Sequence, residues 1–413
     1  MAPSVSTALL QVIDRWVGTP VCLSFSLAEK LMRVCFPAEA APDAPKKILF
    51  VKFAEQGSTV LAQSALRRAV ALVGAENVYC VVFDENRFIL DVLGIVPEAN
   101  VLTIRHGSVA ELAREGFAAL GKIRALEIDT VVDLEFFARS SAAFTWLTRA
   151  PRRIGFHTFF GEGPYRGDLM THRLLYNPYL HTAQIFEQMV IAATADPQTL
   201  PTWDVPPQPL VPQPPCFVPK PGEVEQLQTI LSQACGSDPR RLILLNPNAS
   251  DLLPLRKWPS GRYVTLAQRL LQQFPEAHIV LTGAVAEAGA ASELIRQIGS
   301  PRCISLAGRT SLRQLMVLYM LGDLLITNDS GPAHFAALTP INVLTLFGPE
   351  TPSLFGAPTP RSTSLWLGLA CSPCVNAYNN RQSPCRNNLC MQGITVDRVF
   401  EEAVRILEAR WAR

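Results

Sequence analysis

The chain lacks several signals that would define its class at once. Its net charge is only +2 over 413 residues, which is not the basic surface of a nucleic-acid-binding protein, so we expect no nucleic-acid partner. It has no charge-free apolar run of the ~18–20 residues that a transmembrane helix needs. Residues 1–20 lack a basic region ahead of their apolar residues, so we expect no secretory signal peptide and a cytoplasmic protein. No G-x-G-x-x-G follows an expected strand, which disfavours a dehydrogenase.

The composition is that of a folded protein with sizeable cores, because 48% of the residues are hydrophobic and 17% are charged. The length fits two or three domains. The ten cysteines are then expected to be thiols or metal ligands in a reducing compartment.

The N-terminal segment, residues 5–36, is predominantly apolar but is interrupted by charges. Its pattern predicts two short amphipathic helices that are broken at Gly18-Thr19-Pro20. Two interpretations stay open: the segment packs against the body of the protein, or it attaches peripherally to the inner face of the cytoplasmic membrane. Residues 37–45 have the composition of a tether.

From Lys46 onward, apolar strands alternate with helices, a pattern that predicts a parallel, doubly wound α/β sheet. The pattern stops in a proline-rich stretch, 197–221, and then restarts. Two such halves favour a ligand cleft between domains. The expected segments are the amphipathic segment and tether (1–45), a first domain (46–205), a linker (206–221), a second domain (222–394) and a C-terminal helix (395–413).

The stretch LLITNDSGPAHFAAL, 324–338, changes from an apolar strand to a helix pattern through six polar or turn-forming residues. Ligands of open parallel sheets bind beyond the carboxyl ends of strands. Asp329 or Ser330 can cap the helix, whose free N–H groups attract an anion, and Gly331 permits close backbone approach. An ordinary capped turn explains the same residues, so both interpretations stay open.

Two further strand ends repeat this polar pattern. Strand 242–245 runs into NPNAS, 246–250, and then into Arg256-Lys257, two adjacent cations that suit a diphosphate. Glu287 follows a third strand end, where it can accept from a ribose hydroxyl or only favour the helix dipole. A solvated charge pair is the alternative for the two cations.

Taken together, these segments resemble glycosyltransferase family 9, the ADP-heptose–lipopolysaccharide heptosyltransferase family. The likeness covers roughly 46–410 and is looser in 85–220. The segments that carry it are KKILFVKFAEQGSTVLAQSALRRA (46–69), LLNPNAS (244–250), RKWP (256–259), LTGA (281–284), SLAGRTSLRQL (305–315), LLITNDSGPAHFAA (324–337) and LFGPETP (346–352).

The resemblance implies a GT-B fold, in which two Rossmann-like doubly wound domains face a cleft. It implies inverting sugar transfer without a metal cofactor, from a nucleoside-diphosphate sugar, an ADP-sugar first, to a lipid-linked or cell-surface glycan such as lipopolysaccharide. Arg256 falls on the family's phosphate-binding lysine. The donor-binding residues implied by position or by the strand-end pattern are Asn248, Ser250, Arg256, Lys257, Glu287, Asp329, Ser330, Gly331 and His334.

One departure concerns catalysis. The family's first loop reads Gly-Asp, and that Asp is the presumed base, whereas this chain has Gly57-Ser58. A serine is not a general base unaided. Glu55 in the same loop can take the role, or His157 or Asp168 can. A nucleotide-sugar-binding protein without turnover, or another GT-B enzyme such as an epimerase or phosphorylase, is the alternative function.

Acceptor-binding candidates lie in the first domain. Lys52 and Gly57 of the family loop are two of them. Lys52 matches a basic position of that loop, although a solvent-exposed lysine explains it equally. Residues 152–184 interleave cations with aromatic residues, which fits an anionic or sugar acceptor but also an ordinary surface loop. The candidates in this stretch are His157, Arg166 and His172.

Four cysteines cluster with the spacing C-x2-C-x10-C-x4-C. The first pair is a good zinc half-site, whereas the second pair is wider than usual. A structural zinc, one or two disulfides, and free thiols in a packed loop all stay open. The four are Cys371, Cys374, Cys385 and Cys390.

Overall fold

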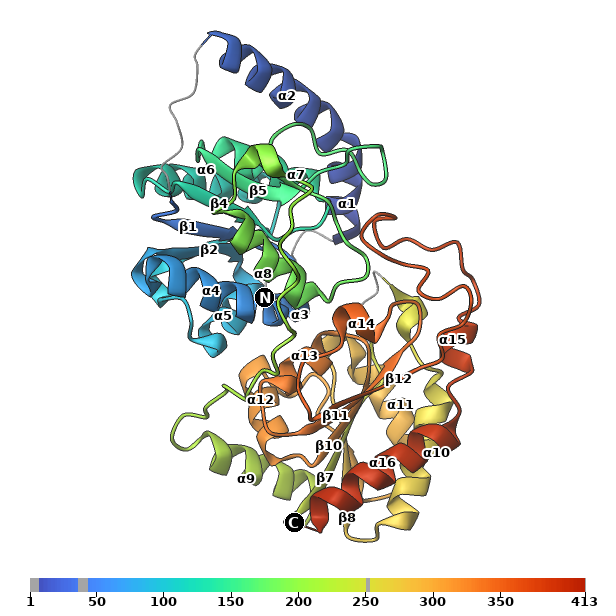
Figure 1. Cartoon of the computed structure of the whole chain (residues 1–413). Helices are drawn as coiled ribbons and strands as arrows, with labels where there is room; N and C mark the ends of the chain where they lie inside the picture. The colour runs from blue at the N-terminus through green and yellow to red at the C-terminus, as the bar shows by residue number, and fades with distance from the viewer. Residues whose placement is uncertain (1–6, 36–43, 250–252, 413) are drawn as a thin grey trace. The chain divides into compact units, whose positions relative to one another are not determined.

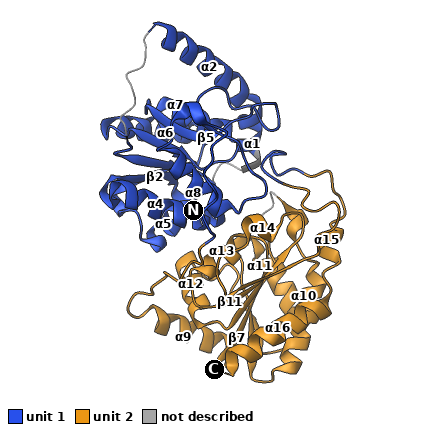
Figure 2. Ribbon diagram, viewed as in Figure 1, with its two compact units in different colours: residues 1–210, 376–382 blue, residues 211–375, 383–413 orange. Residues whose placement is uncertain are grey.

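The computed structural model describes residues 7–35, 44–249 and 253–412 (Figure 1). The chain forms two compact units (Figure 2). Unit 1 comprises residues 1–210 and 376–382, and unit 2 comprises residues 211–375 and 383–413. The N-terminal segment therefore belongs to unit 1, and the middle of the cysteine-rich stretch, expected in the second domain, belongs to unit 1 as well.

Unit 1 contains one parallel sheet of six strands in the order β3-β2-β1-β4-β5-β6. This order is that of a doubly wound dinucleotide-binding fold, which reverses direction between β1 and β4. The strands are β1 (Ile48–Val51), β2 (Val78–Phe83), β3 (Val101–Ile104), β4 (Thr130–Asp133), β5 (Arg152–Phe156) and β6 (His172–Leu174), and the helices are α1 (Thr7–Trp16), α2 (Gly18–Cys35), α3 (Gln56–Leu61), α4 (Gln63–Val73), α5 (Arg87–Leu93), α6 (Val109–Ala125), α7 (Arg139–Leu147) and α8 (Thr182–Ala192).

Unit 2 repeats the same topology with six parallel strands in the order β12-β11-β10-β7-β8-β9. Here the direction reverses between β7 and β10. The strands are β7 (Arg241–Asn246), β8 (Ala277–Leu281), β9 (Cys303–Ser305), β10 (Leu324–Asn328), β11 (Asn342–Phe347) and β12 (Ser362–Trp366), and the helices are α9 (Glu223–Cys235), α10 (Ser260–Gln273), α11 (Ala288–Ile298), α12 (Leu312–Leu321), α13 (Gly331–Ala337), α14 (Pro352–Phe355), α15 (Leu389–Gln392) and α16 (Val396–Trp411). The prediction of two parallel, doubly wound sheets is confirmed.

The central strands read as continuous apolar runs because helices cover both faces of each sheet. Every residue of β1 and β4 is buried, and every residue of β10 is buried. With side chains packed on both faces, the open carboxyl ends of the strands are where polar residues reach solvent.

Helices α1 and α2 pack on unit 1 through one face only. Cys22 of α2 lies in an apolar cluster with Ala142 of α7 and with Leu169 and Met170. Glu29, on the same face, accepts hydrogen bonds from Trp146 Nε1 (2.7 Å) and from Arg153 (2.9 Å). The predicted packing against the body of the protein is thus present. No helix of the described ranges is long and apolar enough to span a bilayer.

Candidate functional site

The candidate site of unit 2 is built on the two strands at which the sheet order reverses. Asn328, the last residue of β10, is fully buried, and its Oδ1 accepts from the Trp258 backbone N–H and the Tyr263 hydroxyl, both at 3.1 Å. Its Nδ2 donates to the carbonyls of Pro247 and Asn248. Asn328 therefore ties the end of β10 to the loop after β7 and to the segment that carries the two predicted cations.

A second set of amide contacts adds the end of β8. The Asn246 amide donates to the Thr282 hydroxyl (3.1 Å), and the Asn248 amide donates to the Thr282 carbonyl (3.3 Å). A Cβ at Gly283 would lie 2.8 Å from both the Asn248 amide and the Glu287 carboxylate. A side chain at 283 would therefore make the ends of these two predicted donor side chains shift.

Arg256 is held between two buried carboxylates that follow neighbouring strands. Its guanidinium lies 3.3 Å from Glu350, after β11, and 3.8 Å from Asp329, after β10. Both carboxylate side chains are at most 4% exposed, and that of Arg256 is 14% exposed. Arg256 Nε has no hydrogen-bond partner among the described residues. The two carboxylates thus fix the orientation of the guanidinium fork at these strand ends.

The turn into α13 differs in detail from the expected cap. Ser330 occupies the N-cap position, but its side chain makes no capping hydrogen bond, and its hydroxyl donates instead to the Asn328 carbonyl (3.2 Å). Gly331 does not need a left-handed backbone; a Cβ there would lie 3.1 Å from the Phe335 ring. His334 is buried on α13. Asp329, Ser330 and His334 thus all lie in the turn after β10 or in the short helix that follows it.

The remaining donor candidates are placed less specifically. Glu287 accepts from the Ala284 backbone N–H (2.7 Å), so its carboxylate caps its own turn. The side chain of Lys257 is half-buried beside Arg256. Ser250 lies outside the described residues. Ribose binding by Glu287 stays a prediction, next to the capping role that the contact provides.

The candidate site of unit 1 lies at the ends of β1 and β4, where that sheet reverses. Lys52 is buried, and its Nζ donates to the Ala54 carbonyl (2.5 Å) and to Glu135 (3.0 Å), which follows β4. Gly57 and Ser58 lie inside α3 rather than in a loop. The acceptor role of Lys52 stays a prediction, and the structure gives this residue a buried ion pair.

Glu55 precedes α3 with a left-handed backbone, φ 66°. The Ser58 hydroxyl lies 3.0 Å from the Glu55 carbonyl oxygen and 3.3 Å from its Oε2. The Arg381 guanidinium pairs with Glu55 Oε1. The structure thus brings Glu55 and Ser58 together, as their spacing suggests, and adds a cation from a distant part of the chain.

The other base and acceptor candidates lie apart from Glu55 in the chain and are mostly buried. Arg166 forms a fully buried ion pair with Asp133, and burial raises the pKa of that carboxyl to about 6 against the opposing effect of Arg166. Burial lowers the pKa of His172 to about 4. Burial likewise lowers the pKa of His157, whose Nε2 lies 3.8 Å from Asp168. Their functional roles stay predictions.

The four cysteines of the cysteine-rich stretch, all of which the structure describes, form no disulfide. Cys371 is exposed and Cys390 is buried, and the Ser383 hydroxyl donates to Cys374 Sγ (3.2 Å). Burial raises the pKa of Cys390, and the neighbouring Cys374 and Cys385 act in the same direction. Across the described residues no three His, Cys, Asp or Glu side chains are arranged to hold a metal ion. A zinc site is therefore still only a prediction.

Sequence reasoning missed three residues of these sites. Glu350 stands in the quoted motif LFGPETP without an assigned role, because its partner Arg256 is 94 positions away. Asn328 looked like a turn residue rather than the link between three segments. Arg381 carried no signal, since nothing local indicates a pairing over 326 positions.

Known proteins with similar sequences are heptosyltransferases. The chain is 33% identical to lipopolysaccharide heptosyltransferase 2 of Salmonella typhimurium over 28% of this chain and 33% of that protein. It is 27% identical to lipooligosaccharide heptosyltransferase 2 of Campylobacter jejuni over 41% of this chain and 52% of that protein. The matches thus span a third to about half of these relatives' lengths. The corresponding Haemophilus ducreyi protein is 25% identical over 74% of this chain and 84% of its own.

Solved structures agree on the fold. ADP-heptose lps heptosyltransferase II of E. coli superposes with a TM-score of 0.65 at 21% identity, covering 88% of this chain and 99% of that one. A family 9 glycosyl transferase from Veillonella parvula gives the same TM-score at 17% identity, covering 89% and 99%. The model of glycosyltransferase family 9 (heptosyltransferase) matches residues 118–383. Because that match spans more than half of the chain, the protein belongs to glycosyltransferase family 9.

Proposed function

We propose that this protein transfers a sugar, heptose in the first instance, from a nucleoside-diphosphate donor to a lipopolysaccharide-like acceptor. The observation that carries the proposal is the Arg256 guanidinium, held at the strand ends of unit 2 by Asp329 and Glu350. A fork fixed in this way is suited to a diphosphate. ADP is the favoured nucleotide, because similar solved structures contain ADP or an ADP-heptose analogue.

The proposed mechanism is a single inverting displacement. The acceptor hydroxyl oxygen attacks the anomeric carbon while the bond from that carbon to the diphosphate oxygen breaks. Negative charge develops on the departing diphosphate, and the guanidinium of Arg256, with Lys257 beside it, stabilises that charge. This step needs no metal ion, because the cations of the chain meet the developing charge.

Glu55 is the proposed base that takes the proton of the acceptor hydroxyl. Its Oε2 lies next to the Ser58 hydroxyl, which stands where the family has its presumed catalytic Asp. A carboxylate three residues earlier thus replaces a carboxylate at position 58. His157 and Asp168 are the alternative bases, and both belong to unit 1.

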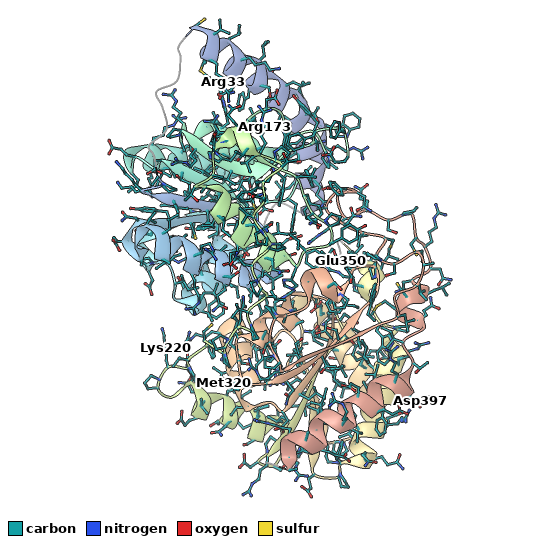
Figure 3. The ribbon with its side chains drawn as sticks, viewed as in Figure 1. Arg33, Arg173, Lys220, Met320, Glu350 and Asp397 are labelled. Atoms are coloured by element: carbon teal, nitrogen blue, oxygen red, sulfur yellow. The ribbon has the colours of Figure 1, made fainter. Side chains whose placement is uncertain are left out.

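The acceptor is lipid-linked in this proposal, and the outward face of α2 is proposed to rest on the membrane surface. Four apolar side chains recur there at helical spacing, and Val34 is 82% exposed. Arg33 (labelled in Figure 3) and Lys30 lie beside this face, whereas Glu29 turns inward to Arg153. An apolar stripe flanked by cations suits an anionic lipid surface. The stripe consists of Leu23, Leu27, Leu31 and Val34.

The decisive experiment offers the full-length protein ADP-heptose and a lipopolysaccharide that lacks heptose. We expect free ADP and an acceptor heavier by one heptose in the mass spectrum. A thermal-shift series with nucleoside diphosphates accompanies it, since a ligand of the folded state raises Tm by mass action. A raised Tm without product would identify a non-catalytic nucleotide-sugar-binding protein. This is the second candidate function, and the serine at position 58, in place of the family's Asp, favours it. An altered donor sugar without transfer would identify another GT-B enzyme.

A further inference from the structure

Residues 376–382, here called the strap, are a short excursion of the chain into unit 1. The flanking residues belong to unit 2, where the backbone N–H groups of Cys374 and Val375 both donate to the Pro349 carbonyl. Pro349 immediately precedes Glu350, the partner of Arg256. The residues just before the strap are therefore hydrogen-bonded to the loop of unit 2 that carries Glu350, whereas the strap itself makes its contacts in unit 1.

Five contacts, made by Tyr378 and Arg381, fix the strap on unit 1. The Tyr378 hydroxyl donates to the Tyr176 carbonyl, and the two rings meet edge to face at 5.1 Å. The Tyr378 ring also packs on Phe137 at 5.6 Å. Arg381 lies 6.0 Å from the Phe136 ring centre while its guanidinium pairs with Glu55. The aromatic contacts anchor the strap, so the ion pair is not its sole attachment.

The backbone of the strap is shaped to present Arg381. Asn380 and Arg381 both have left-handed backbones, with φ 54° and 53°, a conformation that is uncommon outside glycine. The Arg381 N–H donates to the Asn376 carbonyl (3.0 Å), which closes the turn. The tight turn thus brings the Arg381 guanidinium to Glu55, the proposed base, which an ordinary surface loop would not need to do.

We propose that Arg381 is a positioning residue for Glu55. It binds Oε1, holds the carboxylate ionised and fixes its orientation, so that Oε2 receives the proton as the acceptor oxygen bonds to the sugar and the diphosphate leaves. This inference rests on the proposed transferase function. A cation beside a carboxylate favours its ionised form. The base is thereby active at lower pH than it would be alone.

The test compares Arg381→Met, Arg381→Lys and wild type across pH. In Arg381→Met we expect the acidic limb of the kcat profile to move up by about 1 pH unit, with donor KM unchanged. In Arg381→Lys the limb should lie closer to its wild-type position than in Arg381→Met. Added guanidinium should move the limb of Arg381→Ala part of the way back towards wild type. A control variant should keep the wild-type limb: Arg386→Ala, which removes an exposed cation of the same stretch. An unmoved limb in Arg381→Met overturns the inference while leaving transfer itself intact.

A second measurement does not depend on activity. Urea unfolding midpoints of Glu55→Gln, Arg381→Met and the double variant form a double-mutant cycle. Because each single change breaks the same pair, we expect the double variant to unfold at a midpoint above the additive expectation. Additive midpoints mean that the pair does not form, and they overturn the inference even if the wild-type protein transfers no sugar.

Discussion

Replacing Arg256 by Met tests both the stability and the chemistry of the proposed donor site. The guanidinium lies 3.3 Å from Glu350 and 3.8 Å from Asp329, and both carboxylates are almost fully buried. Removing one partner of a buried pair costs ~3–5 kcal/mol. In a folding unit of about 150–250 residues, ~1 kcal/mol lowers Tm by ~2–4 °C. We therefore expect Tm to fall by about 6–20 °C.

The effect on activity is separate from the effect on stability. A hydrogen bond to a charged group contributes ~1.5–3 kcal/mol. If Arg256 binds the leaving diphosphate in the transition state, kcat/KM falls by roughly 10- to 150-fold. The assay is the release of ADP from ADP-heptose with acceptor present, at a temperature below the Tm of the variant. The exposed Arg398 provides a matched control, and Arg398→Ala should change neither quantity.

The double variant Arg256→Met/Glu350→Gln separates the two effects. Glutamine removes one of the two buried charges (Glu350 is labelled in Figure 3), so part of the lost stability should return. Activity should stay low, because the cation is still absent. Recovery of transfer together with Tm would refute the phosphate role of Arg256, as would wild-type kcat/KM in folded Arg256→Met.

Four further outcomes follow from the same structure. Glu55→Ala should abolish transfer and His157→Ala should not; the reverse result would reassign the base. Leu27→Glu should lose co-sedimentation with anionic vesicles, whereas Val285→Glu, an exposed apolar control in unit 2, should not; equal binding would remove α2 from the membrane. Metal analysis of the purified protein should give one zinc per chain if the four cysteines form the predicted site, and a zinc-free, fully folded protein would exclude it. His172→Gln should make the stability of the protein less sensitive to acid. The folded pKa of His172, about 4, lies below 6.5, so the wild-type protein loses stability as pH falls from 6.5 towards 4. Urea unfolding midpoints that match wild type at every pH would contradict this.

The elements that the sequence predicts well are those with long, uniform patterns. β7 and β10 are continuous apolar runs with polar residues directly after them, so both the strands and the candidate site at their ends could be predicted. β6 and β12 were missed, because β6 has three residues and every residue of β12 but Leu365 is only partly buried. The missed helix α7 has a weak pattern, with buried Ser141 and Thr145 among its apolar residues.

Contacts between segments that are distant in the chain could not be predicted from local sequence patterns. The role of Arg256 was predicted from its neighbours in the chain, but Glu350 and Arg381 depend on how the chain folds back. The burial of Arg166 was also unpredicted: a cation among aromatic residues suggests a binding surface, whereas the structure pairs it with Asp133 inside unit 1. Only the fold distinguishes a buried cation that serves structure from one that serves a ligand.

Glu55, with its left-handed backbone, is in direct contact with Ser58. A non-glycine residue in the left-handed region costs on the order of 1–3 kcal/mol and persists where the surroundings enforce it. At Glu55 the carbonyl accepts the N–H groups of Ser58 and Thr59, while the carboxylate is held by the Ser58 hydroxyl and Arg381. An Asp at position 58 would set two carboxylates beside one another, and like charges so close would oppose the ionised form of Glu55. Serine at 58 and glutamate at 55 are therefore a coupled choice: we expect Ser58→Asp to gain activity only when Glu55 is replaced at the same time.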